Sequence, residues 1–340
     1  MFGRIVRYTL AVLGGLALMS GAAAAQSRVT IAVGGAGCLC HLPIILAGQL
    51  GEYKKAGMQV ALVDFEADAP AFFAMMYGGT ADVVSSYFDH GVGLTAKVQA
   101  VKAFVTYGRY PGFALVVSPK PAGTISSVKD LANKKLGVSA PDPDRLLAYL
   151  KSLLIKNDVD PNSVDVIGIG LAGAAVAAME NGAVDAAIMV DPTITQLQGK
   201  YRDLKFVIDA RTQNGTLDAF GAEYPGGTLI AKNEWIAAHP KETQAITNAV
   251  LATLKWIHSH TPEEVVANMP PELVGPDKAL YLAALKNTIP MYSVTGRMEP
   301  KGAQAALDVF SQSSPESKNA KIDLSQSYTN EFVEQTQRMR

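Results

Sequence analysis

Residues 29–65 read VTIAVGGAGCLCHLPIILAGQLGEYKKAGMQVALVDF, and this stretch decides the fold class. Val29 to Val33 predict a buried strand, the loop 34–41 follows it, and Pro43 opens an apolar helix that turns into a second strand. A glycine-rich loop at a helix N-terminus exposes backbone N–H groups that can bind a ligand. The stretch therefore predicts a strand–loop–helix unit that carries a small-molecule site on its loop.

Residues 1–25 have the pattern of an export signal. Arg4 and Arg7 form a basic start, an apolar run extends over 8–19, and three alanines at 23–25 supply a cleavage site. The apolar run is short for a membrane span, and an uncleaved anchor is the alternative. We therefore predict a cleaved signal peptide over 1–25 and a mature chain in the periplasm.

The composition excludes several classes of protein. The chain holds 30 basic and 31 acidic residues, which are scattered rather than clustered, so nothing favours a nucleic-acid partner. Its two cysteines, Cys38 and Cys40, are too few for a disulfide scaffold. Residues 26–340 are enough for two domains with good cores, and we expect a monomer.

Apolar runs typical of strands alternate with helical patterns up to Pro240, and helices follow beyond it. This alternation predicts an α/β fold with a mostly parallel sheet. The predicted strands cover 29–33, 60–65, 81–85, 103–107, 114–117, 135–138, 164–167, 186–190, 206–208 and 227–231.

Two recurring patterns indicate two lobes. The helix end, glycine turn and Asp of residues 76–83 recur at 179–186. The segments 107–112 and 220–227 are both rich in Gly, Pro and Tyr, and we interpret them as the two crossovers of a hinge. One lobe would then comprise 26–108 plus 226–340, and the second 109–225.

Motifs along the mature chain resemble those of periplasmic solute-binding proteins of the nitrate/sulfonate/taurine ABC importers, including relatives similar to thiamine-pyrimidine-precursor binders. The matching motifs are LP at 42–43, GEYKKAG at 51–57, GGTADV at 78–83, YPGF at 110–113, VKDLANKKLGV at 128–138, NGAVDA at 181–186 and DP at 191–192. The resemblance implies the type II two-lobe fold, a ligand in the cleft, and delivery to an inner-membrane permease with a separate ATPase. A Walker loop is absent from the sequence, so this chain does not supply the ATPase.

Ligands of open α/β sheets bind beyond the carboxyl ends of the strands, so the residues that follow each strand are candidates. The first group is Cys38, Leu39, Cys40 and His41, which we assign to ligand contact; a tight loop with packed cysteines is the alternative. A Cys38–Cys40 disulfide and a thiolate–imidazole metal site are two further interpretations. We expect neither a metal nor a cofactor.

The next strand end carries Tyr87, Phe88, Asp89 and His90. The two aromatic rings are suited to stacking on an organic ligand, and Asp89 and His90 to hydrogen bonds with its polar end. For His90, a capping role is the alternative. Asp68, after the preceding strand, is expected mainly to cap a helix.

Three more positions complete the candidate ligand contacts. Ser139, Asp142 and Arg145 follow one strand; the aspartate would repel an anion at the helix N-terminus unless it caps the helix, which allows a less anionic or bifunctional ligand. Asp191 follows another strand and suits a ligand or lobe-to-lobe bond. Arg109, at the hinge, suits a ligand carboxylate, with a structural ion pair as the alternative.

The sequence therefore predicts the solute-binding component of an ABC importer for a small carboxylate, sulfonate or aromatic heterocycle. An enzyme of the pyrimidine-synthase type that uses Cys40 and His41 is the first alternative, and the export signal argues against it. A sensory binding subunit is the second alternative.

Overall fold

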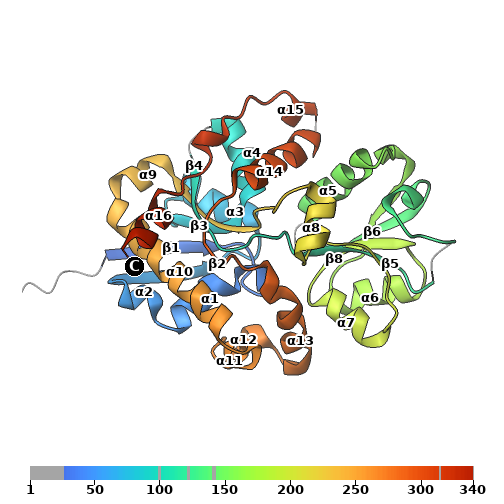
Figure 1. The fold of residues 1–340 in the computed structure, drawn as a ribbon, viewed down its shortest axis with the longest axis horizontal. Helices are drawn as coiled ribbons and strands as arrows, with labels where there is room; N and C mark the ends of the chain where they lie inside the picture. The colour runs from blue at the N-terminus through green and yellow to red at the C-terminus, as the bar shows by residue number, and fades with distance from the viewer. Residues whose placement is uncertain (1–26, 99–100, 121–122, 140–142, 314, 340) are drawn as a thin grey trace, which may run out of the picture.

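Ten strands of the described residues form two five-stranded sheets, one in each of two lobes that lie side by side (Figure 1). The computed structural model describes residues 27–339 apart from 99–100, 121–122, 140–142 and 314, so the predicted signal peptide and Asp142 lie outside the described residues. The strands of lobe 1 are β1 (Ser27–Val33), β2 (Met58–Asp64), β3 (Val83–Tyr87), β4 (Val101–Thr106) and β10 (Gly227–Lys232). Those of lobe 2 are β5 (Phe113–Val117), β6 (Lys135–Ser139), β7 (Asp165–Gly168), β8 (Ala186–Val190) and β9 (Phe206–Asp209).

The two sheets have the same topology. Lobe 1 has the order β2-β1-β3-β10-β4, and lobe 2 has the order β7-β6-β8-β5-β9. The recurring Asp makes the same kind of hydrogen bond in both sheets. Asp82 accepts a hydrogen bond from the Thr30 N–H of β1, and Asp185 accepts one from the Lys135 N–H of β6. Each carboxylate thus ties the start of a central strand to its parallel neighbour, which explains the repeated motif.

Both sheets are mostly parallel, as expected, but each contains one antiparallel strand and is therefore mixed. β10 is antiparallel to β3 and β4, and β5 is antiparallel to β8 and β9. These are the two strands that follow the crossovers. A chain that leaves one sheet at its carboxyl edge enters the facing sheet at that sheet's carboxyl edge, so the entering strand must run the opposite way.

Helices cover the faces of both sheets (Figure 1). The buried strands β3, β5 and β8 have no exposed residue, as expected for strands covered on both faces. The helices are α1 (Leu42–Gln49), α2 (Glu52–Lys55), α3 (Asp68–Phe73), α4 (Phe88–Val98), α5 (Pro143–Lys156), α6 (Ala172–Glu180), α7 (Thr193–Lys200), α8 (Gln213–Phe220), α9 (Asn233–Ala238), α10 (Pro240–Ser259), α11 (Pro262–Ala267), α12 (Pro271–Val274), α13 (Lys278–Thr288), α14 (Pro300–Ser313), α15 (Pro315–Lys318) and α16 (Glu331–Arg338). Over the described residues, none of them has the length and apolar character that a bilayer span requires.

The two crossovers run side by side between the lobes. The Gly227 carbonyl accepts hydrogen bonds from the N–H groups of Tyr107 and Gly108, both 2.9 Å long, and the Gly108 carbonyl accepts one from Gly226 N–H. A third segment joins them, since Arg109 N–H donates to the Met291 carbonyl. The hinge is therefore a backbone-bonded ribbon reinforced by the C-terminal part of the chain.

The lobes are in contact in this structure. Helix α14 packs on α5, and α13 packs on α7. One apolar cluster runs through both lobes and includes Val84 and Phe88 of lobe 1 with Leu115 and Leu150 of lobe 2. The carboxyl ends of the central strands thus face each other across a closed interface.

Candidate functional site

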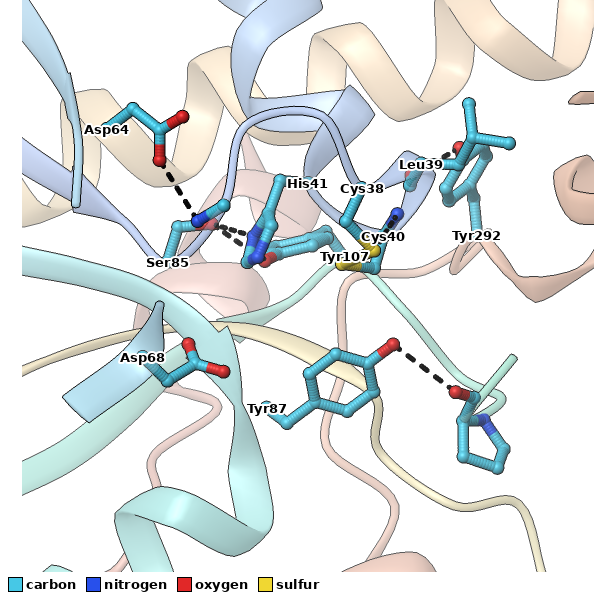
Figure 2. The surroundings of a disulfide bond; sticks show 12 residues. Cys38, Leu39, Cys40, His41, Asp64, Asp68, Ser85, Tyr87, Tyr107 and Tyr292 are labelled. Atoms are coloured by element: carbon cyan, nitrogen blue, oxygen red, sulfur yellow. Dashed lines mark hydrogen bonds between the residues drawn. A yellow bond between two sulfur atoms is a disulfide. The ribbon is translucent and has the colours of Figure 1, made fainter. Parts of the chain in front are cut away.

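His41, Ser85 and Tyr107 form a buried polar triad in lobe 1 (Figure 2). His41 Nδ1 lies 2.9 Å from Ser85 Oγ and 3.2 Å from the Tyr107 hydroxyl, and the two hydroxyls are 2.7 Å apart. Burial lowers the pKa of His41, the nearby Asp68 opposes this, and Arg145 adds to it. The imidazole is therefore neutral near pH 7, with its Nδ1 held by two hydroxyls.

The loop after β1 positions this histidine. Cys38 and Cys40 are joined by a disulfide, which leaves no free cysteine in the chain. Cys38 Sγ also accepts a hydrogen bond from Cys40 N–H at the start of the short helix 39–41. Tyr292, from the segment beside the hinge, donates to the Leu39 carbonyl at 2.8 Å. The disulfide interpretation thus describes this structure, and Leu39 is fixed as a buried core residue.

Asp68 and His90 form a second polar pair in lobe 1. His90 Nδ1 lies 3.2 Å from Asp68 Oδ2 and 3.1 Å from Ser86 Oγ. Burial alone would raise the pKa of Asp68, but the charge and hydrogen bond of His90, with His41 and Ser86, outweigh burial and lower it. A Cβ at residue 34 would collide with Asp68 Oδ1, so Gly34 is what lets the carboxylate approach the loop. Asp68 is therefore a charged group of the site.

Lobe 2 contributes Arg145, from the first turn of α5. Its guanidinium carbon lies 3.7 Å from the centre of the Tyr87 ring, a cation–π contact between the lobes. Tyr87 in turn donates a hydrogen bond to the Pro111 carbonyl in the first crossover. Ser139, at the end of β6, is fully buried, and its Oγ has no hydrogen-bond partner among the described residues.

Asp89 links the lobes through two tyrosines. Its Oδ2 accepts hydrogen bonds from Tyr149 of α5 at 2.7 Å and from Tyr224 of the second crossover at 3.0 Å. Burial, followed by the charge of Asp89, raises the pKa of both hydroxyls well above the usual value, so they remain donors. Phe88, the residue before, points into the apolar core against Tyr328.

Two other predicted residues make contacts away from this centre. Arg109 lies 3.7 Å from Glu223, and its Nε donates to the Pro290 carbonyl, which corresponds to the structural ion pair. Asp191 accepts from Arg211 at 3.0 Å and from the Thr195 hydroxyl at 2.6 Å, all within lobe 2. Among the described residues, the hydrogen bonds and ion pairs of Arg109 and Asp191 therefore involve neither the triad nor Tyr87.

Sequence reasoning missed several groups that the fold brings together. Asp68 was expected mainly to cap its helix, and this was wrong: Ala67 is the N-cap, no side-chain cap bond forms, and the carboxylate faces His90 instead. Its position after β2, opposite the glycines after β1, was the available signal. Tyr107 and Tyr224 lie in the two tyrosine-rich crossovers, which we interpreted mainly as a hinge. The other missed groups are Ser85, Tyr149 and Arg211, for which the local sequence carries no comparable signal.

The site contains no metal-type cluster within the described part of the chain, where no three His, Cys, Asp or Glu side chains gather as metal ligands. A surface groove lies elsewhere, on lobe 1 between α2, α10 and α16, and holds none of the predicted site residues. The candidate site is instead a buried polar centre at the junction of the lobes, formed by His41, Ser85, Tyr107, Asp68, His90, Tyr87 and Arg145.

Comparisons with known proteins agree with this architecture. The model of the NMT1/THI5-like family matches residues 39–265. A solved structure of a protein from Bordetella bronchiseptica RB50 shares 32% identity, covers 92% of this chain and 98% of its own, and has a TM-score of 0.78. No curated protein sequence matches the chain.

More distant structures share the fold alone. They include the putative periplasmic sulfonate-binding protein SsuA of Methylobacillus flagellatus KT (18% identity, 92% and 94% of the two chains, TM-score 0.70). The desulfurization enzyme DszB is another (16% identity, 92% and 100% of the two chains, TM-score 0.59).

The family match spans most of the chain, and it confirms the resemblance found in the sequence motifs. The protein belongs to the NMT1/THI5-like family and has the two-lobe α/β fold of the periplasmic binding proteins.

Proposed function

We propose that this protein is the extracytoplasmic solute-binding component of an ABC importer, which captures a small organic ligand between its lobes. Lobe 1 would comprise 26–108 plus 226–340, and lobe 2 109–225. The export signal over 1–25 supports a periplasmic location, and a permease with a separate ATPase would receive the ligand. We propose that it works as a monomer.

The observation that carries the proposal is the meeting of polar and aromatic groups from both lobes at the carboxyl ends of central strands. His41 and Tyr87 follow or end strands of lobe 1, and Arg145 enters from α5 of lobe 2. Ligands of such sheets bind in this position. The distant relative SsuA, described as sulfonate-binding, has the same fold and supports an organic acid as ligand.

The disulfide supports binding over catalysis. An enzyme that uses Cys40 as a nucleophile needs a thiolate, and in this structure the Cys40 sulfur is bonded to Cys38. Because the desulfurization enzyme DszB shares the fold, turnover is measured alongside binding in the test.

The test is a thermal-shift screen of purified residues 26–340 against carboxylates, sulfonates and pyrimidines, followed by calorimetry. We expect saturable stabilisation by at least one compound and its recovery unchanged by mass spectrometry. Arg145→Gln should weaken this binding at least tenfold, whereas Arg202→Gln, an exposed arginine of the same lobe, should leave it unchanged. Conversion of the compound, or equal binding by both variants, would contradict the proposal.

A further inference from the structure

Asp68 is a buried carboxylate with one oxygen that the described residues leave without a partner. Its side chain is 10% exposed, and Oδ2 is paired with His90. Oδ1 is buried and accepts no hydrogen bond from the described part of the chain. In Figure 2 the carboxylate points towards the region between His41 and Tyr87. A buried carboxylate oxygen is costly unless a donor reaches it, so this atom marks a place for an N–H or O–H group.

Arg145 places the opposite charge on the same region from lobe 2. Its side chain is buried and its guanidinium lies on the Tyr87 ring, 3.7 Å from the ring centre. Figure 2 places the Asp68 carboxylate beside His41 and Tyr87, and Arg145 lies on the Tyr87 ring, so the two charges border one centre. Their opposite effects on the pKa values of His41 and Tyr87 agree with this placement. The buried Ser139 hydroxyl, at the end of the strand before α5, adds an uncharged group on the side of lobe 2.

Simple ligands satisfy only half of this arrangement. An anion such as an alkanesulfonate suits Arg145 but meets the unpaired oxygen of Asp68, and a simple amine suits Asp68 but meets the guanidinium. Hydrogen bonds to charged groups are strong only where charge and geometry match. A ligand that carries both groups pairs with both lobes at once.

We propose, on the basis of the function proposed above, that the ligand is bifunctional: an organic acid that also carries a protonated amine or an N–H donor. Asp68 receives the nitrogen group on lobe 1, and Arg145 receives the acid on lobe 2. Ligand choice thus rests on a pair of opposite charges, one in each lobe, and each lobe alone recognises half of the molecule.

The experiment uses matched sets of probes on purified residues 26–340. One set is p-aminomethylbenzoate with p-toluate and p-methylbenzylamine; the other is homotaurine with propanesulfonate and propylamine. Calorimetry gives the affinity for each probe. The member that carries both groups should bind about ten- to a hundredfold more tightly than either relative that lacks one group.

Two variants assign the groups. Asp68→Asn should remove the preference for the amine and leave the affinity for the acid-only probe unchanged or higher. Arg145→Gln should remove the preference for the acid. Glu66→Gln, an exposed carboxylate two residues before Asp68, is the matched control and should change no affinity. Thermal unfolding of each variant shows that it is folded.

The outcomes separate this inference from the proposed function. The inference is supported if the wild-type protein prefers the two-group probe and Asp68→Asn abolishes that preference. Equal or tighter binding of the acid-only probes, or binding in the broad screen of compounds with a single group only, overturns the inference and leaves the proposed function standing. Absence of binding by every compound of both panels contradicts the proposed function itself.

Discussion

At the scale of single residues, the histidine after the glycine-rich loop is the most informative. His41 is buried, bonded to Ser85 and Tyr107, and close to Asp68, Arg145 and Asp64. Its pKa is lowered in the folded protein, mainly by burial. The unfolded chain therefore binds a proton as pH falls through about 6.5, and the folded chain binds it only at lower pH.

The first prediction follows from this lowered pKa of His41. The free energy of unfolding should fall as the pH is lowered from about 7.5 to about 5, because protonation of His41 stabilises only the unfolded state. His41→Asn, which keeps a polar atom near Nδ1 and does not titrate, should show a smaller fall. Urea unfolding at both pH values measures the difference. Equal pH dependence in both proteins would exclude His41 as a source of the fall in stability.

The second prediction concerns the cysteines. Both are engaged in the Cys38–Cys40 disulfide, so unfolded but unreduced protein should take up no iodoacetamide, and reduced, unfolded protein should take up two equivalents. Intact-mass spectrometry reads both states. Unfolding before alkylation exposes any buried thiol, so protection that persists in the unfolded protein reports the disulfide. Uptake by the unreduced protein would show that the thiols are free.

At the scale of elements, strand β10 connects the hinge to the site. A Cβ on Gly227 would collide with the Tyr107 ring, whose hydroxyl bonds Ser85 and His41. The strand can thus pair with β4 and accept two crossover hydrogen bonds only because this residue lacks a side chain. The glycine fixes both the path of the second crossover and the position of Tyr107.

The third prediction is that Gly227→Ala destabilises the protein by about 1–3 kcal/mol through overpacking and weakens ligand binding by displacing Tyr107. The control is Gly168→Ala, at an exposed residue of β7 where an added Cβ meets nothing within 4 Å. Chemical denaturation and calorimetry measure the two effects. A Gly227→Ala protein as stable as the control would show that the ring moves aside without cost.

The fourth prediction concerns α5. Tyr149→Phe removes a hydrogen bond to the buried Asp89 carboxylate and should cost about 1.5–3 kcal/mol of the free energy of unfolding. Tyr201→Phe, whose hydroxyl lies 3.4 Å from the half-buried Glu180, should cost less than about 0.5 kcal/mol. Urea denaturation of the pair provides the comparison, and equal costs would mean that Tyr224 alone satisfies Asp89.

At the scale of the whole molecule, polar contacts between the lobes accompany closure. Asn287 of α13 donates to the Thr195 hydroxyl of α7 at 2.9 Å, and Thr195 in turn donates to Asp191. Asp191 and its partner Arg211 thus hold in place the group that meets the other lobe. The Asn287–Thr195 bond exists only while the lobes are together.

The fifth prediction is that Asn287→Ala shifts the ligand-free protein towards an open arrangement, with a larger radius of gyration by small-angle X-ray scattering, and weakens ligand binding up to about tenfold. Added ligand should restore the compact form. Asn162→Ala, which removes only a local turn contact with Asp160, is the control. An unchanged radius in Asn287→Ala would show that α13 and α7 do not govern closure.

Much of the fold was accessible from local patterns. The ten predicted strands are all present, with ends displaced by at most two residues. Apolar runs bounded by glycine turns predict strands from the local sequence alone. The direction of β5 and β10 was not accessible, because it depends on how the chain crosses between lobes. The glycine-rich loop indicated His41 as a candidate site residue, but its hydrogen-bond partner Tyr107 is 66 residues away.

The sequence by itself determined the α/β class, the two similar units, the crossovers and the family, since short-range patterns of apolar residues, glycines and motifs indicate each of them. Only the tertiary structure decided which side chains share a site. Asp68 and Arg145 lie on different lobes, and the contact of Arg145 with Tyr87 follows from lobe packing that no local pattern encodes. Burial, which sets the charge states of His41 and Asp68, likewise arises only when distant segments pack together.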